Sequence, residues 1–212
     1  MHYTVFDTPV VRPVFRWISR MSLKAAGWKV MGEPPRDPKY VIVAAFHTSN
    51  WDFPIGLFMA FALGVKIYWI GKDSLFRKPF GPLMRWLGGI PVNRRGSHNM
   101  VSRTIEAFQE HESLGIAITP EGTRGKAPYW KTGFYHIAVG AGVPIVLAFL
   151  DYRLKTGGIG PVMLPTGDIE ADMVKICLLY PSDAADVLPS VDLGCSRIIK
   201  KNHYPISLHT IP

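Results

Sequence analysis

Five short apolar runs, rich in β-branched or aromatic residues, recur along the chain, and helical patterns separate most of them. We predict strands at residues 40–46, 66–71, 89–94, 114–119 and 143–152. We predict helices at residues 52–63, 83–87, 97–112 and 132–139. Strands that alternate with helices are typical of α/β proteins, in which a helix leads from one parallel strand to the next. The sequence therefore predicts an α/β fold with a largely parallel or mixed central sheet flanked by helices.

The length and composition of the chain fit a single domain. The chain has 212 residues, of which 48% are hydrophobic and 19% are charged. A chain of this size and composition can bury a sizeable core. We assign residues 1–32 to a basic amphipathic helix at a membrane interface, residues 33–176 to the main domain and residues 177–212 to an atypical C-terminal tail.

The N-terminal segment has the pattern of an amphipathic helix with one basic stripe. Between residues 9 and 28, cations recur at intervals of four residues, and apolar side chains fall mostly on the other side. The cations are Arg12, Arg16, Arg20 and Lys24, and the apolar residues are Val11, Val14, Phe15, Ile18, Met21 and Ala25. Like charges at this spacing repel one another in water, and an anionic surface would reverse that effect. Two interpretations stay open, an anchor on an anionic membrane that uses Phe15 and Trp17, and a surface helix packed on the core.

No uncharged stretch of the chain has the pattern of a helix that spans a bilayer, and the stretch at residues 133–150 is broken by GAGVP. Residues 53–65 carry no charge but number only 13, whereas a spanning helix needs about 20 residues. The first residues also lack the apolar region of a secretory signal. We therefore predict a peripheral or monotopic protein on the cytoplasmic face of a membrane.

The formal net charge of +8 points to a polyanionic partner, although it could also serve solubility alone. Nucleic acid, an anionic membrane surface and phosphorylated substrates are the candidate partners. The sequence contains no nucleic-acid fold signature, and its cations do not alternate with stacking aromatic residues. We therefore expect no nucleic-acid partner.

The tail of residues 177–212 differs from the rest of the chain. It has no sustained hydrophobic period, it contains both cysteines, and its three cations balance three anions. The segment LLYPSDAADVLPSVDLG resembles a translated sequencing adapter, so we interpret the tail as non-native and expect it to be poorly packed. A chain without cysteines before Cys177 suits a reducing compartment. No metal-ligand spacing occurs, and we predict neither a metal site nor a cofactor.

His47 and Asp52 form the first candidate for catalysis, in the segment HTSNWD. On one continuous helix these two residues would lie about 140° apart and would not meet. They can meet if His47 follows a strand, the residues between them turn, and Asp52 opens a helix capped by Ser49 or Asn50. Asp52 would then fix the imidazole tautomer, and the free ring nitrogen could take a proton from a hydroxyl. The spacing alone is also compatible with a chance pairing near one turn.

The loop TPEGTRGK at residues 119–126 is the second candidate. It places Glu121, Gly122, Thr123 and Arg124 directly after a predicted strand. A guanidinium there can bind a phosphate with two hydrogen bonds, and a carboxylate can bind a hydroxyl or orient the arginine. The alternative is a surface turn with a local ion pair, which would contribute little.

Arg94 and Lys72 follow two further predicted strands. For Arg94 we favour phosphate binding, and for Lys72 a solvated surface charge is an equal alternative. In α/β folds, ligands bind beyond the carboxyl ends of the strands. His47, Arg94 and Glu121 all follow such ends, which supports one shared site more strongly than any of these residues does alone.

Taken in order, these segments resemble the blocks of the glycerolipid acyltransferase family, typified by 1-acyl-sn-glycerol-3-phosphate acyltransferases. The blocks are HTSNWD, GGIPVNR, PEGTR and VPIV, and the resemblance covers roughly residues 38–152. Two positions depart from the family pattern. Thr119 stands where an aromatic residue is usual, and Asn93 replaces a common acidic residue.

The resemblance implies an O-acyltransferase of phospholipid biosynthesis. By this resemblance His47 is the general base and Asp52 holds and balances it, while Arg94, Glu121 and Arg124 hold the phosphate and glycerol parts of a lysophosphatidate-like acceptor. We add Gly122, Thr123 and Lys72 as substrate-binding candidates. The donor would be acyl-CoA or an acyl carrier protein, and the acceptor a lysophospholipid at an anionic membrane surface.

Two other functions stay open at this point. The same His–Asp pair could activate water in an ester or thioester hydrolase, although the chain has no G-x-S-x-G nucleophile motif. The chain could also be a non-catalytic basic module that binds lipid. Neither the acceptor, which could also be an aminoacyl lipid precursor, nor the acyl length follows from the sequence.

Overall fold

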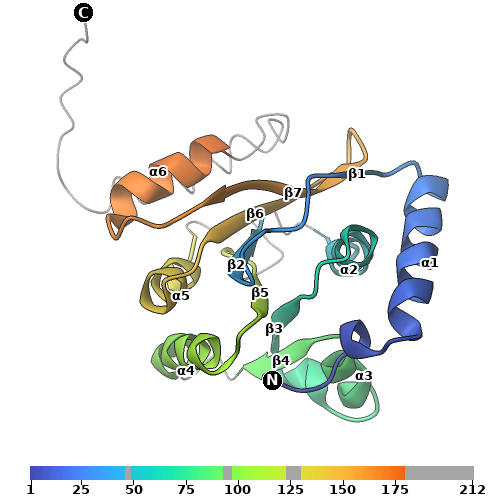
Figure 1. The fold of residues 1–212 in the computed structure, drawn as a ribbon, viewed down its shortest axis with the longest axis horizontal. Coiled ribbons are helices and arrows are strands. Elements are labelled where there is room, and N and C mark those ends of the chain that lie inside the picture. The colour runs from blue at the N-terminus through green and yellow to red at the C-terminus, as the bar shows by residue number, and fades with distance from the viewer. Residues whose placement is uncertain (46–48, 93–96, 123–129, 180–212) are drawn as a thin grey trace, which may run out of the picture.

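A sheet of seven strands lies between two layers of helices (Figure 1). The computed structural model describes residues 1–45, 49–92, 97–122 and 130–179, with the backbone alone at residues 97–99. The order of the strands across the sheet is β1-β7-β6-β2-β5-β3-β4. The predicted α/β fold with a mixed central sheet is confirmed.

The five predicted strands lie side by side in this sheet and all run in the same direction. They are β2 (Lys39–Ala44), β3 (Tyr68–Lys72), β4 (Gly89–Val92), β5 (Leu114–Ile118) and β6 (Ile145–Asp151). β2 pairs in parallel with both β5 and β6, and β3 pairs in parallel with both β4 and β5. The carboxyl ends of all five strands therefore lie along one edge of the sheet.

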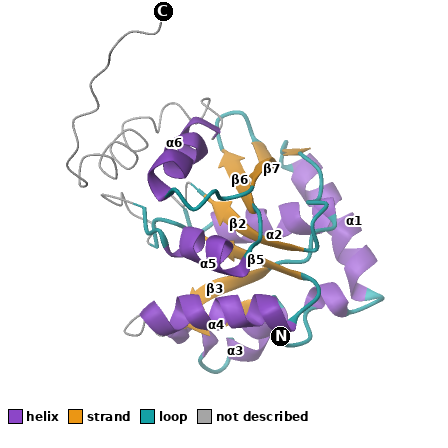
Figure 2. Ribbon diagram, turned by 60° about the vertical axis from the view of Figure 1, so that its left-hand side comes forward, coloured by secondary structure: helices purple, strands orange, loops and turns teal. Residues whose placement is uncertain are grey.

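Helices connect the parallel strands and cover both faces of the sheet (Figures 1 and 2). The connecting helices are α2 (Asp52–Leu63), α3 (Gly81–Trp86), α4 (Ser97–Glu110) and α5 (Gly133–Ala141). The first helix is α1 (Val11–Ala25), the last is α6 (Ile169–Leu179), and two short 3-10 helices span Val5–Asp7 and Asp73–Phe76. One layer contains α4, α5 and α6, and the other contains α2 and α3 with α1 packed outside α2.

The core lies on both faces of the central strands, which explains their continuous apolar sequences. On one face, Val41 and Val43 of β2 are fully buried in a cluster with Ile137 of α5. On the other face, Ile42 packs in a cluster with Val65, directly after α2. Alternate residues of one strand thus bury against opposite helical layers, and the sheet holds the strand ends rigidly.

Two strands were not predicted, β7 (Thr156–Met163) and β1 (Lys29–Met31). β7 runs antiparallel to β6, and β1 pairs in parallel with β7. Side chains at two glycines would prevent this pairing. A Cβ atom on Gly158 would lie 2.0 Å from the Met31 carbonyl oxygen, and one on Gly32 would lie 1.9 Å from the carbonyl oxygen of Ile159. These glycines allow the backbones of β1 and β7 to approach each other. Because glycine is uncommon in strands, they also leave β7 without the β-branched and aromatic residues from which a strand is predicted.

The basic stripe of α1 lies beside α2. Leu23 is buried against α2, while Arg12 and Arg20 donate hydrogen bonds to the carbonyl oxygens of Gly64 and Ala62, at 3.4 and 3.2 Å. Cations are favourable there because the last carbonyl groups of a helix carry partial negative charge. Two cations of the stripe therefore form hydrogen bonds within the protein, which the sequence pattern did not predict.

The outward side of α1 is apolar. Its exposed residues at helical spacing are Val14, Trp17, Ile18 and Met21, with Trp17 65% exposed. Among the helices in the described parts of the chain, none is both long enough and apolar enough to cross a bilayer. The exposed surface of α1 thus combines an apolar stripe with the flanking cations.

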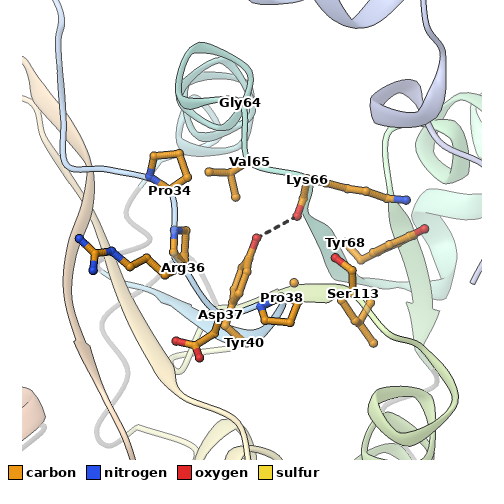
Figure 3. A pocket seen from close by; sticks show the side chains of 13 residues that line it. Pro34, Arg36, Asp37, Pro38, Tyr40, Gly64, Val65, Lys66, Tyr68 and Ser113 are labelled. Atoms are coloured by element: carbon orange, nitrogen blue, oxygen red, sulfur yellow. Dashed lines mark hydrogen bonds between the residues drawn. The ribbon is translucent and has the colours of Figure 1, made fainter.

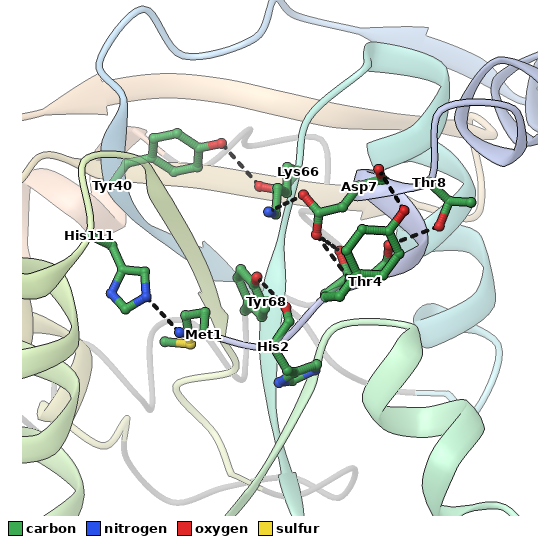
Figure 4. Close-up of polar contacts among 10 residues, drawn as sticks. Met1, His2, Thr4, Asp7, Thr8, Tyr40, Lys66, Tyr68 and His111 are labelled. Atoms are coloured by element: carbon green, nitrogen blue, oxygen red, sulfur yellow. Dashed lines mark hydrogen bonds and ion pairs between the residues drawn. The ribbon is translucent and has the colours of Figure 1, made fainter.

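The first residues are held at the amino-end edge of the sheet (Figure 4). The Met1 ammonium donates to Nε2 of His111 at 2.6 Å, and the Tyr68 hydroxyl donates to the carbonyl oxygen of His2 at 2.9 Å. Asp7 forms a salt bridge with Lys66 at 2.5 Å. This network closes the edge opposite to the strand ends that carry the predicted site residues.

At the other terminus, α6 continues to Leu179, past the boundary that we predicted at residue 177. Ile176 is fully buried in the main core, whereas Leu178 is 80% exposed. The prediction that the tail is poorly packed concerns mostly residues 180–212, which lie outside the described residues.

Candidate active site

The carboxyl ends of the five parallel strands give the site its frame. Across this edge the strands follow the order β6, β2, β5, β3 and β4. Asp52 follows β2, Glu121 and Gly122 follow β5, and Lys72 ends β3. The sheet therefore brings these predicted residues to one edge from three neighbouring strands. His47, Arg94, Thr123 and Arg124 lie outside the described residues, and their positions stay predictions.

Asp52 is buried and held in place by the turn before α2. It is the first residue of α2, and only 7% of its surface is exposed. The Ser49 backbone N–H donates to its Oδ2 atom at 2.8 Å. A carboxylate at a helix N-terminus is also favoured by the positive end of the helix dipole. The chain therefore turns back on itself directly before Asp52, as the prediction of a turn in HTSNWD requires.

The predicted cap of this helix needs a correction. Trp51 rather than Ser49 or Asn50 occupies the cap position, and no side chain forms a cap hydrogen bond there. The Ser49 hydroxyl instead accepts the N–H of Trp51 at 3.1 Å. The Ser49 backbone N–H donates its hydrogen bond to the Asp52 side chain. The start of α2 is therefore held by this tight turn and not by a capping side chain.

Tyr152 is a further residue at this edge of the sheet, and no motif in the sequence indicates it. It directly follows β6, and its hydroxyl donates to Oδ1 of Asp52 at 2.5 Å. Burial and this hydrogen bond to the carboxylate raise the pKa of Tyr152 well above the ordinary 10.0, so the phenol stays protonated and donates. Its position in the sequence could have indicated it, because Tyr152 lies at the end of a predicted strand whose carboxyl end reaches the same edge of the sheet. The neighbouring positions of β6 and β2 follow from the tertiary fold and from no local sequence pattern.

The loop after β5 holds Glu121 in a buried position. Glu121 is 8% exposed. Gly122 has a φ of +62° and donates its N–H to the carbonyl oxygen of Thr119 at 3.2 Å. This left-handed conformation favours glycine and explains the Glu-Gly pair in the motif. The Lys131 N–H donates to the carbonyl oxygen of Pro120 at 2.8 Å, so the two ends of the loop lie close together.

Lys131 is the second residue that the sequence analysis missed. Its side chain lies over Gly122, and a Cβ atom on that glycine would be 3.0 Å from its Nζ atom. Lys131 is exposed and lies two residues before the start of α5. An ammonium group thus stands over the backbone of the loop that carries Glu121, where it can attract an anion.

Lys72 lies at the edge as an exposed residue. In the parallel ladder it is paired with Val92, the last residue of β4. No hydrogen bond or ion pair of its side chain with another described residue is found. Its ammonium group is therefore available to an anionic ligand at the end of the sheet where Arg94 follows Val92 in sequence.

A separate hollow of about 220 Å³ lies at the opposite edge of the sheet (Figure 3). Its lining includes Tyr40, Lys66 and Leu114, which belong to the amino ends of strands or precede them. Tyr40 donates to the carbonyl oxygen of Lys66 at 3.4 Å across its wall. None of the predicted site residues that the structure describes lines this hollow, so it lies apart from the described part of the candidate site.

The described residues at the carboxyl edge provide two buried carboxylates and two exposed ammonium groups. A buried carboxylate held by fixed donors can orient and charge-balance a neighbouring imidazole, and ammonium groups can bind phosphate. Within the described parts of the chain, no group of three His, Cys, Asp or Glu side chains is placed to hold a metal ion. The prediction that neither a metal nor a cofactor takes part stays a prediction.

The site combines a parallel sheet, a fixed aspartate after one strand and a Glu-Gly loop after the neighbouring strand. Comparison with known protein families identifies the class of protein that has these features. The family model described as Acyltransferase matches residues 28–148, and the chain belongs to this family. The resemblance inferred from HTSNWD, GGIPVNR, PEGTR and VPIV is thus confirmed.

Curated relatives share one description, 1-acyl-sn-glycerol-3-phosphate acyltransferase. The relative from Haemophilus influenzae is 33% identical over 144 residues, which cover 63% of this chain and 58% of that protein. The relative from Escherichia coli is 32% identical over 162 residues, which cover 68% of this chain and 64% of that protein. The chain thus spans less than two thirds of the length of these relatives.

A solved structure has a similar fold. It is the 1-acyl-sn-glycerophosphate (LPA) acyltransferase PlsC from Thermotoga maritima, with a TM-score of 0.56 and 17% sequence identity. The match covers 92% of this chain and 81% of that one. At this identity the likeness concerns the fold, and it supports the single α/β domain described above.

Proposed function

We propose that the protein is an O-acyltransferase that moves a fatty acyl group from acyl-CoA or acyl carrier protein to the hydroxyl of a lysophosphatidate-like acceptor. Membership of the Acyltransferase family and the names of its curated relatives support this reaction class. The observation that carries the proposal is the buried Asp52 carboxylate, which is fixed at the carboxyl edge of the sheet. Asp52 lies five positions after His47 in the sequence. A fixed carboxylate at this spacing suits the orientation of a catalytic imidazole.

In the proposed mechanism, His47 is the general base and Asp52 balances its charge. His47 takes the proton of the acceptor hydroxyl as the oxygen attacks the thioester carbonyl carbon. A new C–O ester bond forms, the C–S bond breaks, and the proton passes from the imidazolium to the leaving thiolate. Asp52 keeps its charge throughout and stabilises the transient imidazolium. The substrate alcohol is the nucleophile, so no serine is needed.

In this proposal, residues at the carboxyl edge of the sheet hold the acceptor. Arg94 and Arg124 would bind the phosphate, Glu121 and Thr123 would contact the glycerol portion, and Gly122 lets the loop backbone approach. The exposed ammonium groups of Lys72 and Lys131 would add to phosphate binding, which their positions at β3 and over Gly122 support. Such charge-assisted contacts are the strong hydrogen bonds of phosphate sites.

We also propose that α1 attaches the enzyme to the cytoplasmic face of a membrane as a peripheral or monotopic protein. Its exposed Trp17, Ile18 and Met21 would enter the headgroup region, and the flanking cations would attract anionic lipids. The acceptor and the product are both lipids in this proposal, so attachment would place the site next to its substrate supply.

The identity of the product tests the proposed reaction. We expect purified protein with labelled acyl-CoA and lysophosphatidate to give labelled phosphatidate. A panel of other lysophospholipids and aminoacyl lipid precursors would define the acceptor, and a matched acyl carrier protein would define the donor. Labelled free fatty acid without any diacyl product would contradict the proposal and identify a hydrolase.

A further inference from the structure

Both oxygens of the Asp52 carboxylate are held, by donors from two separate parts of the chain. Ser49, in the turn before α2, donates its backbone N–H to Oδ2 at 2.8 Å. Tyr152, directly after β6, donates its hydroxyl to Oδ1 at 2.5 Å. A carboxylate has about four lone-pair positions, so two donors fix its plane and leave it able to accept further hydrogen bonds. The carboxylate therefore has one defined orientation.

The ring of Tyr152 is itself supported. Trp28 contacts it edge-on, with ring centroids 5.2 Å apart. The turn that follows is closed by the Asp151 carboxylate, which accepts the backbone N–H groups of Arg153 and Leu154, each at 2.8 Å. The hydroxyl thus reaches Asp52 from a ring that packing and the turn hold in place. Although 42% of Tyr152 is exposed, its hydroxyl meets a buried group.

The strand order explains why this residue can reach the aspartate. β6 lies next to β2, with Ala148 paired with Ala44, and β6 continues three residues further to Asp151. The turn after β6 therefore rises beside the segment that leads from β2 into α2. A residue 100 positions away in sequence lies within hydrogen-bond distance of Asp52.

We propose that Tyr152 is a positioning residue, which fixes the Asp52 carboxylate in the orientation that holds the His47 imidazole for proton transfer. The role rests on the proposed function, since it acts through Asp52. Because the raised pKa of Tyr152 keeps the phenol neutral, it orients the carboxylate without adding a charge. Loss of the hydroxyl would let the carboxylate rotate, and small misalignments of catalytic groups are costly.

The test is a double-mutant cycle with Tyr152→Phe, Asp52→Asn and the double variant. We expect Tyr152→Phe to lower kcat about 10- to 100-fold with little change in KM for the acceptor. The phenylalanine keeps the ring contact with Trp28. In the Asp52→Asn background the same substitution should change kcat less than about threefold, because its effect passes through the carboxylate.

Tyr135→Phe is the matched control. Tyr135 also donates its hydroxyl to an aspartate, Asp172 Oδ2 at 2.8 Å, but this pair lies in the helical layer of α5 and α6. We expect this variant to lose stability in urea unfolding while the folded enzyme keeps its kcat. Comparing the two variants separates the loss of a tyrosine–aspartate bond in general from the loss of this one.

Three results would overturn the role of Tyr152. The first is a wild-type kcat in Tyr152→Phe when Asp52→Asn lowers kcat. The second is an equal effect of the substitution in both backgrounds, which would mean that Tyr152 acts independently of Asp52. The third is a wild-type kcat in Asp52→Asn, which would contradict the proposed function itself and remove the positioning role with it.

Discussion

Gly122 and Lys131 share a small space at the loop that follows β5. Gly122 adopts a φ of +62°, and the Lys131 ammonium lies over it. The backbone conformation of Gly122 can be predicted from the Pro-Glu-Gly motif. The position of Lys131 depends on how the two ends of the loop meet. Individual residues of the site therefore differ in how far the sequence predicts them.

A methyl group at Gly122 tests this arrangement. Gly122→Ala would strain the backbone by about 1 kcal/mol, and its Cβ would lie 3.0 and 3.2 Å from Nζ and Cε of Lys131. We expect a lower free energy of unfolding in urea and a several-fold higher KM for the acceptor, because the ammonium must move.

Gly142→Ala is the control for this prediction. Gly142 has a φ of +64°, but a Cβ there would meet nothing within 4 Å. It should lose similar stability with no change in KM. An unchanged KM in Gly122→Ala would argue against a role for Lys131 in acceptor binding.

The same contrast holds for the remaining site residues. Asp52, Glu121, Gly122 and Lys72 each follow or end a predicted parallel strand, and the structure places all four at one edge of the sheet. Tyr152 was missed because its partner depends on β6 lying beside β2. Strand order is a property of the tertiary fold, and no local pattern encodes it.

At the scale of elements, β-branched runs predicted the parallel strands well, with ends within about two residues. β7 was missed because its sequence, TGGIGPVM, has three glycines and a proline, and β1 because it has only three residues. α6 was missed because it lies next to the tail, where no sustained period was recognised. In α1 the sequence predicted the amphipathic pattern but not which side faces outward, since its basic stripe partly contacts the end of α2.

The apolar side of α1 leads to a prediction about membrane binding. Trp17→Glu places a charge in the exposed apolar stripe, where Trp17 is 65% exposed. We expect about tenfold weaker partitioning onto anionic vesicles, measured by co-sedimentation, with an unchanged free energy of unfolding. Leu178→Glu is the control, because Leu178 is 80% exposed on α6 in the opposite helical layer. Equal binding by Trp17→Glu and wild type would contradict attachment through α1.

At the scale of the whole molecule, buried phenols link stability to alkaline pH. Burial raises the pKa of Tyr40 to about 12. Burial, and after it the hydrogen bond to Asp172, raises the pKa of Tyr135 to about 12. The folded state thus holds these two protons more tightly than the unfolded chain, whose phenols titrate near 10.0. Their stabilising contribution is complete below that pH and is lost as the pH rises toward the folded pKa.

We therefore expect the free energy of unfolding to fall as the pH rises above about 10, by up to about 1.4 kcal/mol per pH unit for each proton. Urea unfolding at a series of pH values measures this slope. In Tyr40→Phe the slope should be smaller by up to one proton, because one of the contributing phenols is gone. An identical slope in wild type and Tyr40→Phe would show that Tyr40 does not titrate with unfolding.

We propose that His47, held by Asp52, catalyses acyl transfer at the carboxyl edge of the sheet in a membrane-attached enzyme. The most direct test compares wild type with His47→Ala for the rate of phosphatidate formation from labelled acyl-CoA and lysophosphatidate, and for co-sedimentation with anionic vesicles. We predict a loss of about 100- to 10,000-fold in the rate, in the range that general bases contribute, with vesicle binding unchanged. A wild-type rate in His47→Ala would contradict the proposal that His47 is the general base.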